Sequence, residues 1–114
     1  MASVDDAVLR ARALVLHDLT ATRLADASVV SQLEEAVSTR RWWVSQWQEG
    51  VTYVAGLIAQ DVQDSLLDEG RRWPECPRCE GPVHTLNIEP ELGGPDPVWV
   101  CDHAGAVIAA LGEL

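Results

Sequence analysis

Residues 76–84 read Cys76-Pro77-Arg78-Cys79-Glu80-Gly81-Pro82-Val83-His84, and Cys101-Asp102-His103 follows later in the chain. Together these stretches hold all three cysteines and two of the three histidines of the protein. A Cys-x-x-Cys pair followed by a glycine is typical of a zinc knuckle, a tight turn that directs two sulfurs at one ion. A third cysteine on a later hairpin is typical of a zinc ribbon. The last third of the chain is therefore predicted to fold around one metal ion.

A structural zinc ion takes four ligands, so the three sulfurs need a partner. His84 follows Cys79 with four residues between them, as the histidine of retroviral-type zinc knuckles does. His103 is the alternative fourth ligand, and the carboxylate of Asp102 is a less favoured one. The predicted Zn²⁺ ligands are one histidine and the three cysteines: Cys76, Cys79, His84 and Cys101.

Other uses of the cysteines fit less well. An odd number leaves one thiol over, and the chain opens with no secretory signal, so a disulfide framework is not expected. A redox Cys-x-x-Cys is expected to open a helix, whereas Pro74, Pro77 and Pro82 oppose one here. Inert thiols are the remaining alternative.

The predicted zinc site is structural rather than catalytic, because four protein ligands leave no open position for water. A zinc deaminase would also need a His-x-Glu upstream of its Pro-Cys-x-x-Cys. The only upstream histidine is His17, which is followed by Asp18 and Leu19. We expect no enzymatic activity, and we expect His17 and Asp18 to be solvated.

Composition describes a folded and strongly acidic protein. Hydrophobic residues make up 47% of the 114, the net charge is -10, and all eight basic residues are arginines. Such a surface repels nucleic acid, which binds proteins through basic residues on its phosphates. No apolar run approaches the roughly 20 residues that span a membrane, so a cytoplasmic location is expected.

Helical periodicity dominates the first 70 residues. Ser3 is a candidate cap for a helix over 4–19, in which apolar residues recur at every third or fourth position. A second helix is predicted over 28–38 with Ser28 as its cap, and a third over 51–69, stopped by Gly70. Between them, residues 41–47 are rich in tryptophan and are predicted to form a strand.

The three tryptophans in residues 42–47 either fill the core or form a surface for a partner. Trp43 and Trp47 are expected to share a face in a strand and in a helix alike. We expect at least one of Trp42 and Trp47 to be exposed.

The C-terminal part is predicted to be a three-stranded ribbon with strands over 83–88, 98–101 and 106–110 and a proline- and glycine-rich loop over 89–97. The fold class is thus α+β, with N-terminal helices, one Trp-rich strand and a C-terminal three-stranded zinc ribbon. We divide the chain into an N-terminal helical segment (1–40), a Trp-rich strand plus amphipathic helix (41–72) and the zinc ribbon (73–114).

Residues 72–79, 82–84, 99–101 and 109–114 carry a Trp-Pro-x-Cys-Pro knuckle, a His-x-Leu step, a Trp-Val-Cys return and a Leu-Gly-x-Leu tail. In these motifs the chain resembles small uncharacterised zinc-ribbon proteins of actinobacteria over roughly 41–114. The resemblance implies the zinc fold with His84 as a ligand, and implies no activity.

The leading functional interpretation is a non-catalytic zinc-binding module that binds another protein or a second copy of itself. The alternative is an acidic inhibitor or immunity-type protein that acts on a basic partner or mimics the charge of nucleic acid. An enzyme with an open zinc ion and a nucleic-acid-binding protein are less favoured.

Overall fold

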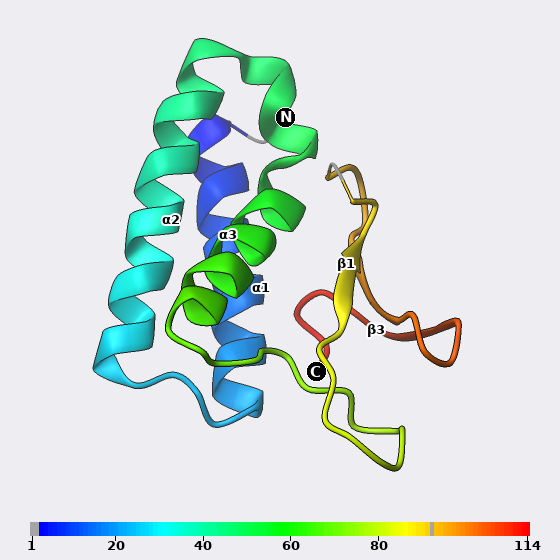
Figure 1. The fold of residues 1–114 in the computed structure, drawn as a ribbon. Coiled ribbons are helices and arrows are strands. Elements are labelled where there is room, and N and C mark those ends of the chain that lie inside the picture. The colour runs from blue at the N-terminus through cyan, green and yellow to red at the C-terminus, as the bar shows by residue number, and fades with distance from the viewer. Residues whose placement is uncertain (1–2, 92) are drawn as a thin grey trace.

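The structure is a computed structural model and describes residues 3–91 and 93–114. Within these ranges, helices precede a small antiparallel sheet (Figure 1). The elements are α1 (Val4–Ala21), α2 (Ala27–Gln46), the 3-10 helix η1 (Gln48–Thr52), α3 (Val54–Asp68), β1 (Asn87–Glu89), β2 (Val98–Cys101) and β3 (Ala106–Ala110). The predicted α+β class is confirmed. No helix in the described ranges is long and apolar enough to cross a membrane.

Helix α1 begins where the sequence predicts. The Ser3 hydroxyl accepts a hydrogen bond from the Asp6 amide at 3.1 Å, and the Asp6 carboxylate reaches back to the Ser3 amide, which makes a capping box. The predicted stripe is buried at Val8, Ala11, Val15 and Leu19. Helix α1 therefore presents one apolar face to the rest of the protein.

The Trp-rich strand predicted over 41–47 is wrong. Residues 28–38 and 41–46 belong to one helix, α2, which is capped by Asp26 rather than Ser28. Val29, Leu33 and Val44 are fully buried, so the helical stripe of the first half continues through the tryptophans. Because α2 packs on both α1 and α3, burial of this stripe outweighs the local β preference of the tryptophans and valine.

Helix α3 is shorter than the predicted range, because η1 occupies residues 48–52 before it. Its stripe is buried at Val54, Ile58, Val62 and Leu66. The helix ends at Asp68 and, as predicted, does not continue past Gly70, whose φ is +77°. The amides of Gly70 and Arg71 donate to the carbonyls of Leu67 and Leu66 at 2.8 and 2.9 Å, which is a Schellman motif.

The sheet has the strand order β1-β2-β3 and is antiparallel throughout. The predicted strands over 98–101 and 106–110 are confirmed. The strand predicted over 83–88 is displaced to 87–89, and Thr85 forms an isolated bridge with Glu75 instead. A β-bulge in β3 leaves Ile108 without a partner, because Val107 pairs with Val100 and Ala109 pairs with Trp99.

Helices and sheet share one hydrophobic core. The three α-helices contact one another, and β1 contacts α3 (Figure 1). Trp73 and Trp99 are fully buried between the two layers and meet edge to face, with ring centroids 5.2 Å apart. The sheet that carries the cysteines is therefore held against the helices by aromatic packing.

Candidate metal centre

The structure brings together four of the residues that the sequence predicts as ligands. The donor atoms of Cys76, Cys79, His84 and Cys101 all lie within 4.8 Å of one another. Cys101 Sγ is 3.5 Å from Cys79 Sγ and 3.4 Å from His84 Nε2. Zn–S bonds of about 2.3 Å and Zn–N bonds of about 2.0 Å place the donors of a tetrahedral site about 3.5–3.8 Å apart. The distances from Cys101 to Cys79 and His84 are thus close to those of a tetrahedral site, and the four donors could hold one metal ion.

A short stem of paired backbone closes the knuckle loop. The Cys76 amide donates to the His84 carbonyl at 2.9 Å, and the Leu86 amide donates to the Pro74 carbonyl at 2.8 Å. The loop between them turns through Gly81, whose φ of +100° is open to glycine and strained for other residues. This stem places His84 opposite Cys76, so one loop supplies three of the four donors.

Cys101 approaches from a second hairpin. It ends β2, and its buried sulfur accepts a hydrogen bond from the Ala104 amide at 3.4 Å. The backbone N–H of Arg78 acts in the same way on the sulfur of Cys76 and lowers its pKa. Both loop tips thus direct backbone N–H groups at a sulfur, an arrangement that stabilises thiolates.

The thiols influence one another strongly. The Arg78 amide lowers the pKa of Cys76, and the Ala104 amide lowers the pKa of Cys101. In contrast, the pKa of Cys79 is raised to about 11, first by the hydrogen bond of Cys79 with Cys101 and then by its hydrogen bond with Cys76. Three thiolates in so small a volume repel one another, and a bound divalent cation would offset that repulsion.

His84 and His103 occupy different positions. His84 directs Nε2 at Cys101, while its Nδ1 lies 3.2 Å from the Pro82 carbonyl, so that an Nδ1–H donor leaves Nε2 free as a ligand atom. His103 stands beside His84, with ring centroids 5.4 Å apart, and is not among the four clustered donors. The carboxylate of Asp102 accepts a hydrogen bond from the Asn87 amide group. The geometry therefore places His84 closest to the sulfurs.

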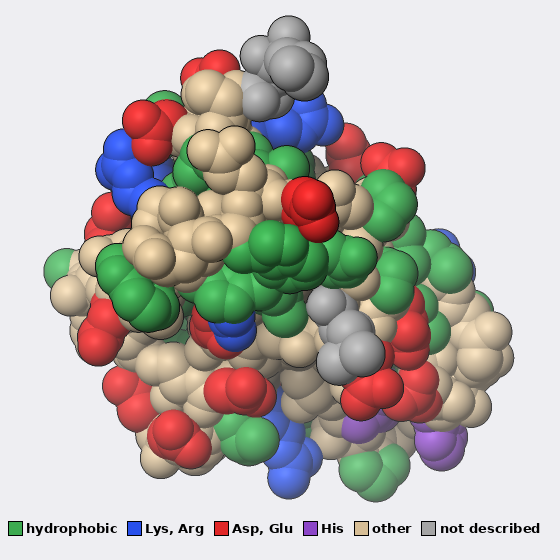
Figure 2. All heavy atoms as spheres, turned by 90° about the horizontal axis from the view of Figure 1, so that it is seen from above, with side chains coloured by type: hydrophobic (Ala, Val, Ile, Leu, Met, Phe, Trp, Pro, Cys, Tyr) green, Lys and Arg blue, Asp and Glu red, His purple; other side chains and the backbone are tan. Residues whose placement is uncertain are grey.

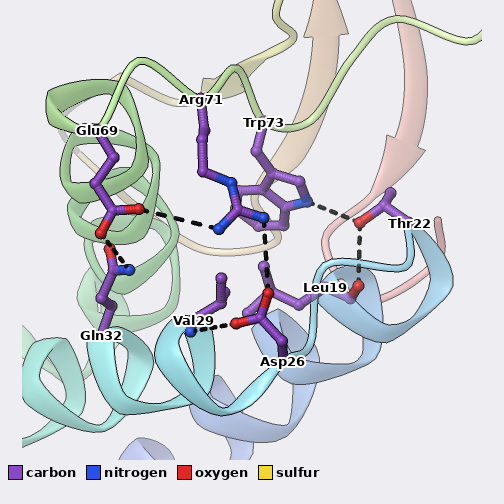
Figure 3. A network of polar contacts seen from close by, with 8 residues as sticks. All are labelled: Leu19, Thr22, Asp26, Val29, Gln32, Glu69, Arg71 and Trp73. Atoms are coloured by element: carbon purple, nitrogen blue, oxygen red, sulfur yellow. Dashed lines mark hydrogen bonds and ion pairs between the residues drawn. The ribbon is translucent and has the colours of Figure 1, made fainter.

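The segment that leads from α3 into the knuckle is tied to the helices (Figure 3). The indole N–H of Trp73 donates to the Thr22 hydroxyl at 2.9 Å, and this hydroxyl lies 3.2 Å from the Leu19 carbonyl at the end of α1. Arg71 lies between two carboxylates, 3.8 Å from Asp26 and 3.9 Å from Glu69. The entry to the knuckle is thereby attached to α1, α2 and α3.

Asp18 is a structural residue that sequence reasoning missed. His17 is exposed as expected, but Asp18 is fully buried. Its carboxylate accepts hydrogen bonds from Trp99 Nε1 and from the amides of Gly112 and Leu114, at 2.8, 2.7 and 2.9 Å. Its position three residues after Val15, on the buried face of α1, was the signal that could have revealed it.

Gln63 on α3 forms hydrogen bonds with the backbone at the base of the knuckle. Its side-chain amide donates to the carbonyls of Trp73 and Leu86 at 3.1 and 2.8 Å. One of these carbonyls belongs to the segment that enters the knuckle loop, and the other belongs to the segment that leaves it. One helical side chain therefore holds both ends of the loop that carries three of the donors.

Fold and site together define a small α+β protein with a helical layer and a Cys₃His candidate metal centre on a ribbon-like sheet. The family model described as "Domain of unknown function (DUF8819)" matches residues 4–111, and the chain belongs to this family. The match includes residues 4–40, which the resemblance to the actinobacterial proteins did not reach. Comparisons with curated proteins and with solved structures give no significant match.

Proposed function

We propose that the protein is a non-catalytic module that holds a structural Zn²⁺ and binds another protein. The convergence of four donors within 4.8 Å carries the metal part of the proposal. Three thiolates and one imidazole are a donor set that suits Zn²⁺ in tetrahedral geometry. With all four positions taken by the chain, the ion has no place for a reacting water, and its role is structural.

The ribbon is a sheet that benefits from a metal. Its strands have only three, four and five residues, and sheets of this size bury little apolar surface by themselves. A metal ion that joins the knuckle loop to the end of β2 would cross-link segments from both halves of the ribbon. The binding free energy of the ion then becomes folding free energy of the ribbon.

Metal analysis of the purified protein tests this part. We expect one zinc per chain, and a substantial loss of bound zinc in Cys101→Ser and in His84→Ala. His103→Ala is the matched control, because it removes the neighbouring imidazole and should keep the metal. Less than half an equivalent of zinc, with all three thiols freely titratable, would contradict a zinc site. Loss of zinc in His103→Ala but not in His84→Ala would reassign the fourth ligand.

Support for a protein partner comes from an aromatic corner, which we define as Trp42, Trp43, Trp47 and Tyr53. Trp47 meets Trp43 edge to face and stacks on Tyr53, with centroids 5.4 and 5.7 Å apart. Trp42 remains 67% exposed and Trp47 44% exposed. Figure 2 looks onto this end of the molecule, where hydrophobic side chains form a band across the surface. Exposed tryptophans of this kind are typical of binding surfaces.

The charge favours a second candidate, the acidic inhibitor or immunity-type protein. The chain carries a net charge of -10, and Arg12, Arg40, Arg41 and Arg71 are already paired with carboxylates. A complex of this kind would weaken steeply with salt. Binding of a purified partner at low and high salt separates the candidates. Loss of binding in Trp42→Ala with little effect of salt supports the aromatic corner, and the opposite result supports the inhibitor.

A further inference from the structure

The two edges of the sheet differ in how they are covered. β1 lies against α3, and two glutamines of α3 reach the backbone next to it, Gln63 at the Leu86 carbonyl and Gln60 at the Glu91 carbonyl. β3 forms the other edge, and among the helices and strands of the described ranges only β2 runs alongside it (Figure 1). One edge is therefore closed by a helix, and the other is open.

The open edge presents backbone groups to solvent. The Leu111 amide donates to the Pro97 carbonyl of the neighbouring chain at 2.9 Å, so residue 111 faces β2. Successive residues of a strand direct their N–H groups to opposite sides, and Ala110 therefore directs its N–H away from β2. The carbonyl of Ala110 accepts the Glu113 amide at 3.0 Å, so at this end the N–H of Ala110 is the outward group left for a partner. Outward backbone groups of a sheet edge are a template for a further strand.

β3 lacks charged or proline protection of its exposed edge, and the bulge at Ile108 is the one protective feature within the strand. Its residues are Ala106, Val107, Ile108, Ala109 and Ala110. Proteins commonly guard such edges with lysine, other charged residues or proline, and this strand has none of them. Val107 is 58% exposed, so its side chain is available to a cross-strand neighbour. Both the backbone and the side chains of β3 suit the addition of a strand.

We propose that β3 binds an extended, basic segment of a partner protein, which adds to the sheet as a fourth strand. This inference rests on the proposed function and names the surface and the partner chemistry. The partner segment is extended, because only a strand can form hydrogen bonds with successive unpaired backbone groups of a sheet edge. The partner segment is basic, because the protein carries a net charge of -10 and attracts positive charge. The exposed carboxylate of Glu113 stands just after β3. The carboxylate of Asp102, in the turn before β3, bonds to Asn87 on the β1 side of the sheet and does not contribute here.

A second copy of the chain fits this edge less well. Two copies would bring together two molecules that each carry a charge of -10. The bulge at Ile108 also bends the edge, and two identical bent edges would have to match along their whole length. A flexible segment can follow the bend, so the occupant is a partner segment.

Binding of a labelled peptide to the full zinc-loaded chain tests the proposal by fluorescence anisotropy. The probe is a peptide of about eight residues, the length of an ordinary strand, in which valine and arginine alternate. A peptide in which valine and glutamate alternate is the charge control. We expect saturable binding of the arginine peptide alone. Ala110→Pro removes the outward N–H and should weaken binding by about tenfold or more.

Two substitutions of one exposed side chain keep the test independent of folding. Val107→Lys should weaken binding of the arginine peptide, and Val107→Glu should preserve or strengthen it. Equal binding by the wild type, Ala110→Pro and both Val107 variants would overturn the proposal, because the peptide would then respond to diffuse charge alone. A dimer in sedimentation that disappears in Ala110→Pro would overturn it in favour of a second copy.

Zinc content measured on the same samples separates this inference from the proposed function. A full equivalent of zinc without binding of the arginine peptide overturns the β3 proposal and leaves the zinc site standing. Absence of zinc together with peptide binding that Ala110→Pro abolishes overturns the zinc site and supports the open edge.

Discussion

The carboxylate of Asp18 on α1 accepts a 2.8 Å hydrogen bond from the indole N–H of Trp99 on β2. The same carboxylate accepts the backbone amides of Gly112 and Leu114, so it joins a helix, the central strand and the end of the chain. A buried carboxylate is tolerated when donors surround it in this way. Asp18 thus joins the helical layer to the sheet by hydrogen bonds, as the Trp73–Trp99 contact joins them by aromatic packing.

Asp18→Ala should lower the free energy of unfolding by roughly 2–4 kcal/mol, because it leaves one indole and two backbone N–H groups without their acceptor. Chemical denaturation followed by tryptophan fluorescence measures this loss. His17→Ala is the matched control at the exposed neighbour and should stay within about 0.5 kcal/mol of the wild type. Equal stability of the two variants would contradict the anchoring role of Asp18.

A pair of substitutions tests the helical state of residues 41–46. Val44 is fully buried and Trp42 is largely exposed, whereas a strand would place both on one face. Val44→Ala should destabilise the protein by about 1–3 kcal/mol through lost burial and a cavity. Trp42→Ala should change the stability by about 0.5 kcal/mol or less. Thermal unfolding measures the stability of both variants. A larger loss of stability in Trp42→Ala than in Val44→Ala would contradict the helical state of residues 41–46.

Removal of the metal should loosen the ribbon and spare the helices. The helices α1, α2 and α3 bury their stripes mainly against one another, while the proposed metal ion would cross-link the two loops of the short sheet. After chelation we expect amide hydrogen exchange to accelerate over residues 74–86 and 98–110, with little change in α1. Acidification should act in the same direction, because protons compete with the metal for the thiolates.

Re-addition of zinc is the control for this experiment and should restore protection in the ribbon. If chelation accelerated exchange equally in the helices and in the ribbon, the metal would support the whole fold. If it accelerated exchange nowhere, the cluster would hold no structural ion.

Two glycines with similar backbone angles should respond differently to alanine. Gly70 has a φ of +77° and open space around the position of a Cβ atom, so Gly70→Ala should cost about 1 kcal/mol from backbone strain. Gly93 has a φ of +83°, and a Cβ atom there would lie 2.9 Å from the carbonyl oxygen of Tyr53. Gly93→Ala should therefore cost more than Gly70→Ala in the same denaturation assay. The reverse order would contradict the close approach of this loop to the start of α3.

The parts of the fold that were predicted correctly depend on local patterns. The apolar stripes of α1 and α3 recur at helical spacing, and Ser3 and Gly70 mark a beginning and an end that depend on backbone groups a few residues away. The strand over 41–47 was mispredicted from local β preference. Trp42 and Trp43 lie on a helix because Val44 extends a buried stripe that begins at Val29, and Trp47 caps the end of that helix.

The candidate site shows the same division. The spacing of Cys76 and Cys79 is enough to indicate a metal knuckle, since two residues so close in the chain lie on one tight turn. The sequence leaves the choice between His84 and His103 open, because each lies within a few residues of a cysteine. The stem between residues 74–76 and 84–86 favours His84, since it turns Nε2 of His84 toward Cys101.

By itself, the sequence determined the helical stripes, the acidic charge and the cysteine and histidine residues that can meet around one ion, because these depend on composition and short-range spacing. Only the tertiary structure decided that α2 is continuous, that Asp18 is buried and that β3 is left open. The partners of Asp18 lie 81 to 96 residues away, and no local pattern encodes a contact over such a separation. Those features depend on how the helices and the ribbon pack together, because that packing decides which surfaces are buried and which stay exposed.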